Sequence, residues 1–372
     1  MTEKSPIRSH FSWYKWAIPV LLGTGAALGM LWWSLDQSVV DPATQQTTTS
    51  RALLTSFEWT GRASWALLAV LGCIALRDFA YILRLRILSF RQFSWKQSFD
   101  HIMLWELASA LTPSVVGGSA IAILVLKRGG MNGGQSVATV FVTAMLDELF
   151  YLIAVPVFLL LSLSTGHFVF PQIEDSTFGD SIPWLFALAY AFIAVLTAII
   201  FTGILRSPER THRWLNRVSN WNLLSRWGVR LRRWSADLLQ ASQSIRSRPR
   251  VFWSKAFGAT MLSWSARFLT LNMILLFFFE TIPHAAVLAR QLVLWLVMTI
   301  SPTPGSSGFA EVALPAFLGD LIGFGYLAVV AIIWRFATYF LYLFIGAWVL
   351  PRWLSKTSST IALGDQTGAV LS

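Results

Sequence analysis

The sequence predicts an all-α polytopic membrane protein: a helical bundle of about six spanning helices plus two oppositely oriented re-entrant helical hairpins. Three observations lead to this fold class. The 372 residues are 55% hydrophobic and only 13% charged, whereas a soluble domain carries about 25% charged residues. Residues 16–35 contain no charged side chain, and about 20 residues of helix cross a bilayer core. Each half of the chain also holds one apolar segment that proline and glycine interrupt.

Six apolar segments are long enough to span a bilayer, and the positive-inside rule orients them. The N-terminal residues 1–15 carry Lys4, Arg8 and Lys15, which places this end in the cytoplasm. The charges between the segments predict a multi-pass protein of a bacterial cytoplasmic (inner) membrane, with one transmembrane domain over 16–355 and a cytoplasmic tail over 356–372. The predicted spans are 16–36, 63–83, 135–164, 182–205, 256–279 and 322–350.

Most of the positive charge lies in one loop. Residues 206–255 hold eleven Arg and one Lys against Glu209 and Asp237, a net charge of +10, while the whole chain carries +11. Trp227 and Trp234 recur at helical spacing within it, which predicts an amphipathic helix at the inner membrane surface. This helix either gathers lipid or anchors the topology. Charge confined to one loop argues against nucleic acid as a partner.

The two interrupted segments, about 98–126 and 286–319, predict the re-entrant hairpins. Each has a Thr-Pro pair and a glycine four residues after the proline: Thr112, Pro113 and Gly117 in the first, Thr303, Pro304 and Gly308 in the second. Proline cannot continue a helix, glycine lets the chain reverse, and irregular backbone at membrane depth must line a cavity. Flanking charges place the hairpins on opposite faces, an inverted repeat that marks the binding site in transporters. Two spans with proline kinks are the alternative.

Four charged residues fall near the centres of predicted spans: Asp147, Glu148, Arg267 and Arg335. Each costs about 2.5–3.5 kcal/mol at a helix centre, so we expect them to be paired or hydrated. Asp147 and Arg335 occupy corresponding places in the two halves, which predicts an acid facing a base. Tyr339 shares the helical face of Arg335. We interpret these charges as a substrate or proton pathway, and the alternative is a structural ion pair that fixes helix register.

Five other charged residues fit structural roles, and two of these also fit a role in binding. Glu311 either contacts substrate or stabilises the first turn of a helix, and Glu106 is similarly ambiguous. Arg77 and Asp78 fit a local, snorkelling pair, and Arg290 fits the outer membrane interface. The predicted substrate-binding set is Thr112, Pro113, Gly117, Gly118, Ser119, Asp147, Glu148, Arg267, Thr303, Pro304, Gly308, Glu311, Arg335 and Tyr339.

The stretches TPSVVGGSAIAILVLKRGG, LDELFYLIAVP and SPTPGSSGFAE resemble the flippase-like transmembrane region of lysylphosphatidylglycerol synthases and their stand-alone relatives. The resemblance covers about residues 60–350. In two-part relatives it implies a membrane region that moves an aminoacylated phospholipid to the outer leaflet and a soluble domain that makes this lipid. This chain leaves about 22 residues after residue 350 for such a domain. It also has Gly118-Ser119 where many relatives have Gly-Glu, so an acid that could recognise a lysyl headgroup is missing.

The resulting hypothesis is a lipid translocase for a phospholipid or another phosphate-bearing lipid. Two half-helices that begin near Gly118 and Gly308 would aim their N-termini at one anion site. No Gly-x4-Gly-Lys loop indicates ATP use. A secondary transporter of a soluble anion is the alternative, and an intramembrane lipid-modifying enzyme is disfavoured because the five His are scattered, without metal or nucleophile–His spacing. We expect membrane lipid as the partner, a homo-oligomer as an open alternative, and no cofactor, metal or catalytic residue.

Overall fold

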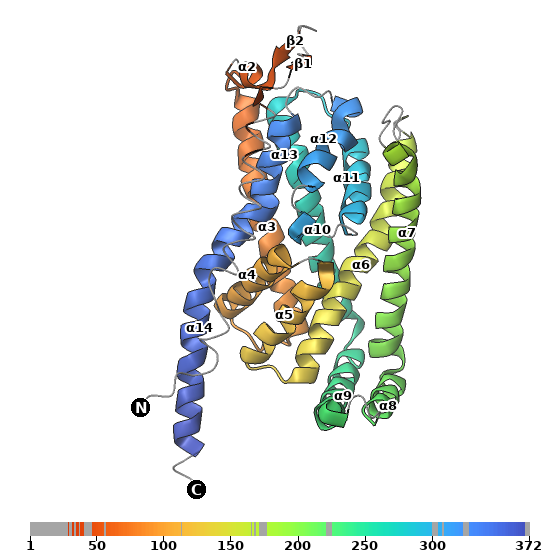
Figure 1. Ribbon diagram of the computed structural model, residues 1–372, viewed down its shortest axis with the longest axis vertical. Coiled ribbons are helices and arrows are strands. Elements are labelled where there is room, and N and C mark those ends of the chain that lie inside the picture. The colour runs from red at the N-terminus through yellow and green to blue at the C-terminus, as the bar shows by residue number, and fades with distance from the viewer. Residues whose placement is uncertain are drawn as a thin grey trace.

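The computed structural model is a bundle of helices elongated along one axis (Figure 1). It describes residues 47–368 except 56, 113, 165, 167–168, 171–176, 221–224, 300–303, 307–308 and 323–326, and before them residues 29, 32, 35, 36 and 38–40. The described part is all-α apart from one short antiparallel β-hairpin, in which Ser38 pairs with Thr49. The predicted all-α fold class is therefore confirmed.

The elements follow one another as labelled in Figure 1. In the first half they are β1 Ser38–Val40, β2 Thr47–Thr49, α2 Ser50–Thr55, α3 Gly61–Leu88, α4 Trp95–Leu111, α5 Ser114–Arg128, α6 Gly133–Ser164, α7 Thr177–Ile200 and the π-helical η1 Phe201–Arg206. In the second half they are α8 Pro208–Val218, α9 Ser225–Arg246, α10 Arg250–Phe278, α11 His284–Thr299, the 3₁₀ turn η3 Pro304–Ser306, α12 Phe309–Ile322, α13 Leu327–Arg335, the π-helical η4 Phe336–Phe340 and α14 Leu341–Gly368.

Five described helices are long and apolar enough to cross a membrane, and each coincides with a predicted span. They are Gly61–Leu88, Gly133–Ser164, Ser181–Arg206, Arg250–Phe278 and Val329–Ser355. The predicted first span, 16–36, falls mostly outside the described residues. Large apolar side chains cover their outer faces, such as Trp184 at 79% exposed and Leu160 at 68%. Such a face is stable in lipid and unfavourable in water.

Each interrupted segment folds into two helices that pack on each other, which we call the first and second helical hairpins. In the first, α4 begins at a capping box of Ser94 and Gln97 and ends at Thr112, and α5 returns beside it so closely that Gly118 lies against Ser109. In the second, α11 and α12 flank η3. The four helices have 17, 15, 16 and 14 residues, or about 21–26 Å, which is shorter than a bilayer core.

The hairpins lie in opposite halves of the molecule, with α4–α5 in the lower half of Figure 1 and α11–α12 in the upper half. Their breaks approach each other at the middle, where α4 contacts η3. That each hairpin re-enters from one membrane face stays a prediction. The largest buried cluster, which includes Leu271, Val293 and Phe317, packs α6 and α10 against the second hairpin, and this packing fixes the walls of the central site.

Candidate functional site

A cavity of about 270 Å³ lies where the breaks of the two hairpins meet the long helices. The first hairpin lines it with Thr112 and Ser119, and the second with Gly305 and Ser306. Five charged side chains also line it: Glu106, Asp147, Glu148, Arg267 and Arg335. Several charged groups therefore line the cavity although it lies among helices that are apolar enough to cross a membrane.

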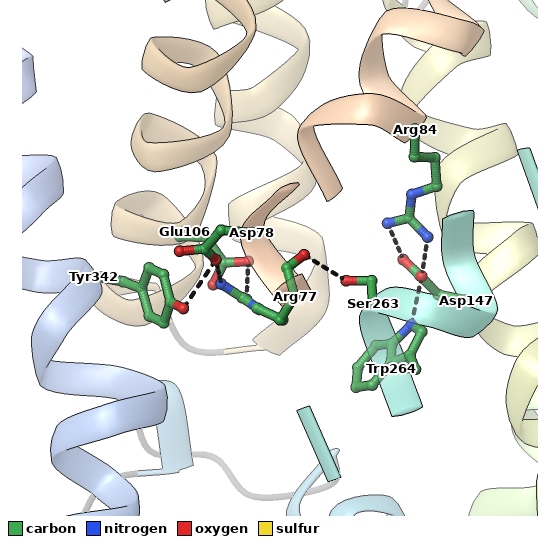
Figure 2. A network of polar contacts seen from close by, with 8 residues as sticks. All are labelled: Arg77, Asp78, Arg84, Glu106, Asp147, Ser263, Trp264 and Tyr342. Atoms are coloured by element: carbon green, nitrogen blue, oxygen red, sulfur yellow. Dashed lines mark hydrogen bonds and ion pairs between the residues drawn. The ribbon is translucent and has the colours of Figure 1, made fainter. Parts of the chain in front are cut away.

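Asp147 of α6, which lines the cavity, forms an ion pair with Arg84 of α3 behind it (Figure 2). The two guanidinium Nη atoms of Arg84 contact the two carboxylate oxygens, with a distance of 3.1 Å from Nη2 to Oδ2. The indole Nε1 of Trp264 donates to Asp147 Oδ1 at 2.6 Å, and Arg84 also contacts Thr260 Oγ1 at 3.1 Å. This fork geometry pairs the buried guanidinium with a half-buried carboxylate without a ligand.

A second network surrounds Arg77, two helical turns before Arg84 on α3 (Figure 2). Arg77 donates to Asp78 Oδ1 at 2.7 Å and to Glu106 Oε1 at 2.6 Å. The hydroxyl of Tyr342 donates to Asp78 at 2.9 Å, and the guanidinium of Arg77 lies 4.2 Å from the centre of the Tyr342 ring. One buried cation thus joins α3, the first hairpin and α14.

Arg335 and Tyr339 connect the two hairpin breaks. Arg335 Nη2 donates to the Gly305 carbonyl at 2.9 Å, and its guanidinium lies 4.1 Å from the Tyr339 ring centre. The Tyr339 hydroxyl donates to the Ala110 carbonyl of α4 at 3.1 Å. Gly305 has φ +55° and its Cα faces the Tyr339 ring, so a side chain there would collide with the ring. Side chains of the last span therefore donate hydrogen bonds to backbone carbonyls at both breaks, which polar backbone at membrane depth requires.

Arg267 and Glu148 differ from Glu106 and Asp147, because neither forms an ion pair within the described residues. The Arg267 guanidinium lies 4.3 Å from the ring centre of Trp295 and 5.2 Å from that of Trp264. Aromatic faces attract a cation but do not neutralise it. The cavity therefore presents one cationic and one acidic side chain that the described protein does not match with an opposite charge.

Seven of the predicted substrate-binding residues line the cavity: Thr112, Ser119, Asp147, Glu148, Arg267, Arg335 and Tyr339. Gly117 and Gly118 lie beside the first break and pack against Thr112 and Ser109. Pro304 begins η3, and Glu311 belongs to the first turn of α12. Pro113, Thr303 and Gly308 lie outside the described residues.

Two interpretations of charged residues were wrong, and a third was right only in part. Asp147 does not face Arg335 across the two halves, because Arg84 takes both of its oxygens. Arg290 does not lie at an interface: its side chain is 1% exposed and pairs with Asp320. Arg77 and Asp78 form the predicted local pair, but Arg77 does not snorkel, since its side chain is 5% exposed and also binds Glu106. In each case an opposite charge inside the bundle pairs with the residue.

Sequence reasoning missed Arg84, Trp264 and Trp295 as members of the site. Arg84 directly follows the predicted span 63–83 and precedes three more basic residues, a position typical of the cytoplasmic flank of a span. A signal was present, since Arg84 lies seven residues after Arg77 and two turns of helix place both on one face. The two tryptophans are not distinguishable by spacing from the other aromatic residues of the spans.

Replacing Gly118 by alanine is expected to destabilise the protein by about 1–3 kcal/mol, because overpacking moves side chains or backbone. A Cβ at Gly118 would lie 2.9 Å from the Ser109 Cα, a backbone atom that cannot rotate away. The control is Gly72→Ala on α3, where a Cβ meets nothing within 4 Å and alanine favours the helix. Unfolding in detergent measures both, and equal stability of the two variants would show that α4 and α5 are not in close contact.

Comparisons with known proteins place this chain among membrane proteins. A family model described as the lysylphosphatidylglycerol synthase TM region matches residues 17–346. A UPF0104 membrane protein of Archaeoglobus fulgidus is 27% identical over 300 residues, which cover 77% of this chain and 86% of that protein. No solved structure matches the chain significantly.

Proposed function

We propose that this chain, which belongs to the family of the lysylphosphatidylglycerol synthase TM region, moves a phosphate-bearing lipid between the leaflets of the bilayer. The observation that carries the proposal is Arg267, a cavity-lining guanidinium that lies against Trp264 and Trp295 and has no carboxylate partner in the described residues. An unmatched arginine inside a membrane is costly, and such residues mark substrate pathways. A phosphate group would match its charge and its planar donor geometry.

The other cavity groups suit a lipid headgroup. Glu148 lies in the same cavity and either balances a cationic group on the headgroup or carries a proton. The volume of about 270 Å³ is just below the range of about 300–1,000 Å³ that is usual for whole drug-sized ligands. In this proposal the headgroup occupies the cavity while the acyl chains stay in the surrounding bilayer.

The two hairpins supply the polar path. In transporters with inverted repeats, the substrate binds near the midplane where discontinuous helices meet. Here Thr112 and Ser119 of one hairpin and Gly305 and Ser306 of the other line one cavity. No step in this proposal needs a covalent change to the lipid. For an anionic lipid, an inside-negative potential favours outward movement by about 2.3 kcal/mol per 100 mV for each charge.

The test is a scrambling assay with fluorescent phospholipid in liposomes that contain the purified protein. Wild type should move lipid faster than empty liposomes do, and Arg267→Gln should slow this movement by about 10-fold to 100-fold, since hydrogen bonds to charged groups contribute about 1.5–3 kcal/mol. Arg51→Gln is the matched control, because it removes the same charge from an exposed position. There Arg51 pairs with Asp36. Movement by wild type at the rate of empty liposomes, or by Arg267→Gln at the wild-type rate, contradicts the proposal.

A further inference from the structure

The lower end of the molecule in Figure 1 carries α8 and α9. Although α9 has 22 residues and α7 has 24, Figure 1 shows α7 along the long axis and α9 nearly end-on. Helices α8 and α9 pack against each other, and both run across the direction of the spans. Helices in this orientation at the end of a membrane bundle lie parallel to the bilayer plane.

One face of α8 is both basic and aromatic. Arg210, Arg213, Trp214 and Arg217 are all exposed, and their spacing of three, four and seven residues places them on one helical face. Trp214 is 61% exposed. The opposite side packs inward, where the Thr211 hydroxyl donates to the Gly203 carbonyl at 2.8 Å. Helix α9 adds the exposed residues Arg232 and Arg233, and Arg232 donates to Asn220 beside the end of α8 at 2.8 Å.

Helix α9 is held firmly against the membrane domain. Gly134 at the start of α6 contacts the backbone of Asp237 and Leu238 so closely that any side chain at this position would collide with it. The Lys127 ammonium lies 5.7 Å from the Trp234 ring centre. The arginines therefore occupy a fixed surface beside the spans.

We propose that the α8–α9 arginine surface, formed by Arg210, Arg213, Arg217, Arg232, Arg233 and Trp214, binds the anionic phosphate groups of the membrane lipid layer next to it. The positive-inside rule requires only that a cytoplasmic loop be positively charged, and Lys meets this requirement as well as Arg does. Residues 206–255 contain eleven Arg and one Lys, and the planar guanidinium binds phosphate through two parallel hydrogen bonds. Trp214, exposed on the same face, is the type of residue that lies at headgroup level. This surface would bind lipid whether or not lipid crosses the bilayer.

The test uses the full chain in nanodiscs of phosphatidylcholine that contain spin-labelled phosphatidylglycerol or spin-labelled phosphatidylcholine. Wild type is expected to associate preferentially with phosphatidylglycerol, and high salt should weaken this preference. The triple variant Arg210→Gln, Arg213→Gln and Arg217→Gln should lower the relative association by at least about fivefold, since each basic residue near the surface contributes about this factor before ordering costs. No preference in wild type, or an unchanged preference in the triple variant, overturns the proposal.

A second triple variant is the matched control. Arg91→Gln, Lys96→Gln and Arg128→Gln remove the same charge from exposed residues outside α8 and α9. This variant should keep most of the preference for phosphatidylglycerol. An equal loss in both triple variants would mean that net charge, not this surface, attracts the lipid, and would overturn the proposal.

A fluorescent label tests the position of the surface independently of the arginines. Cys73 is a free cysteine, the only one in the chain, so Cys73→Ser with Trp214→Cys provides one labelling site. The label should shift to a less polar environment when phosphatidylglycerol replaces phosphatidylcholine, whereas a label at the exposed Glu58, introduced by Glu58→Cys, should not. Fully hydrated labels at both positions overturn the proposal. Retention of single-stranded RNA by the arginines, without any lipid preference, does so as well.

Discussion

Asp147→Ala is expected to lower the free energy of unfolding by about 3–5 kcal/mol, the usual cost of removing one partner from a buried ion pair. The Arg84 side chain is 3% exposed and directs both Nη atoms at Asp147. Without the carboxylate, Arg84 keeps Thr260 Oγ1 as a partner, and its guanidinium cannot lose its proton. The variant therefore leaves an uncompensated charge among the spans.

The reverse change and the double change separate this cost from packing. Arg84→Met should cost less than Asp147→Ala, because Asp147 is 19% exposed and keeps the Trp264 indole as a donor at 2.6 Å. The double variant Arg84→Met with Asp147→Leu should recover most of the loss, since apolar residues of similar volume replace such pairs well. Unfolding of the purified protein in detergent measures all three. A change below about 1 kcal/mol for Asp147→Ala would contradict the pairing.

Asp320→Ala is expected to cost a similar 3–5 kcal/mol, here in the second hairpin. Arg290 of α11 is 1% exposed and contacts both carboxylate oxygens of Asp320 on α12, with 2.8 Å from Nη2 to Oδ2. It also donates to the Phe317 carbonyl at 2.8 Å, so α11 and α12 share one buried cation. Losing the carboxylate should loosen the hairpin at the end away from its break.

Arg290 and Asp320 differ in exposure, so the two single substitutions should differ in their effect on stability. Asp320 is 29% exposed, so Arg290→Leu leaves a carboxylate that water can reach and should cost less than Asp320→Ala. Asp36→Ala is the control, because Asp36 and Arg51 form a pair whose side chains are 59% and 51% exposed, and such pairs contribute at most about 1 kcal/mol. Melting temperatures in detergent would rank the three variants. Equal values for Asp320→Ala and Asp36→Ala would contradict a stabilising role for the buried pair.

The spans and the helix breaks could be predicted because their signals are local. Long charge-free segments and the Thr-Pro pairs are visible in the sequence, and five predicted spans and both interrupted segments correspond to structural elements. The family resemblance is also confirmed, since the family model matches residues 17–346. The same local signals identified cavity residues such as Thr112, Arg267 and Arg335, although their role in binding substrate stays a prediction.

The partners of the buried charges could not be predicted, because they depend on how helices pack. Asp147 on α6 meets Arg84 on α3, which lies 63 residues earlier in the chain, and nothing in the spacing favours Arg84 over Arg335. Symmetry between the halves suggested Arg335, but Arg335 instead donates to the Gly305 carbonyl in a backbone break. Polar backbone at membrane depth must be satisfied, and that requirement competes with charge pairing for the same arginine.

The π-helical turn η4, Phe336–Phe340, has a consequence for how the last span tolerates change in its length. A π turn contains one residue more than an α turn, so deleting a single residue within it would restore regular winding. Because the extra residue is absorbed within the π turn, later side chains would keep their places around the helix axis. Tyr342 would stay beside Asp78, and the face of α14 that packs on α4 would keep its direction. The deletion would change only the turn itself, where Tyr339 lies against Arg335 and donates to the Ala110 carbonyl. A homologue one residue shorter here would therefore keep the packing of its last span and lose this link to the first hairpin.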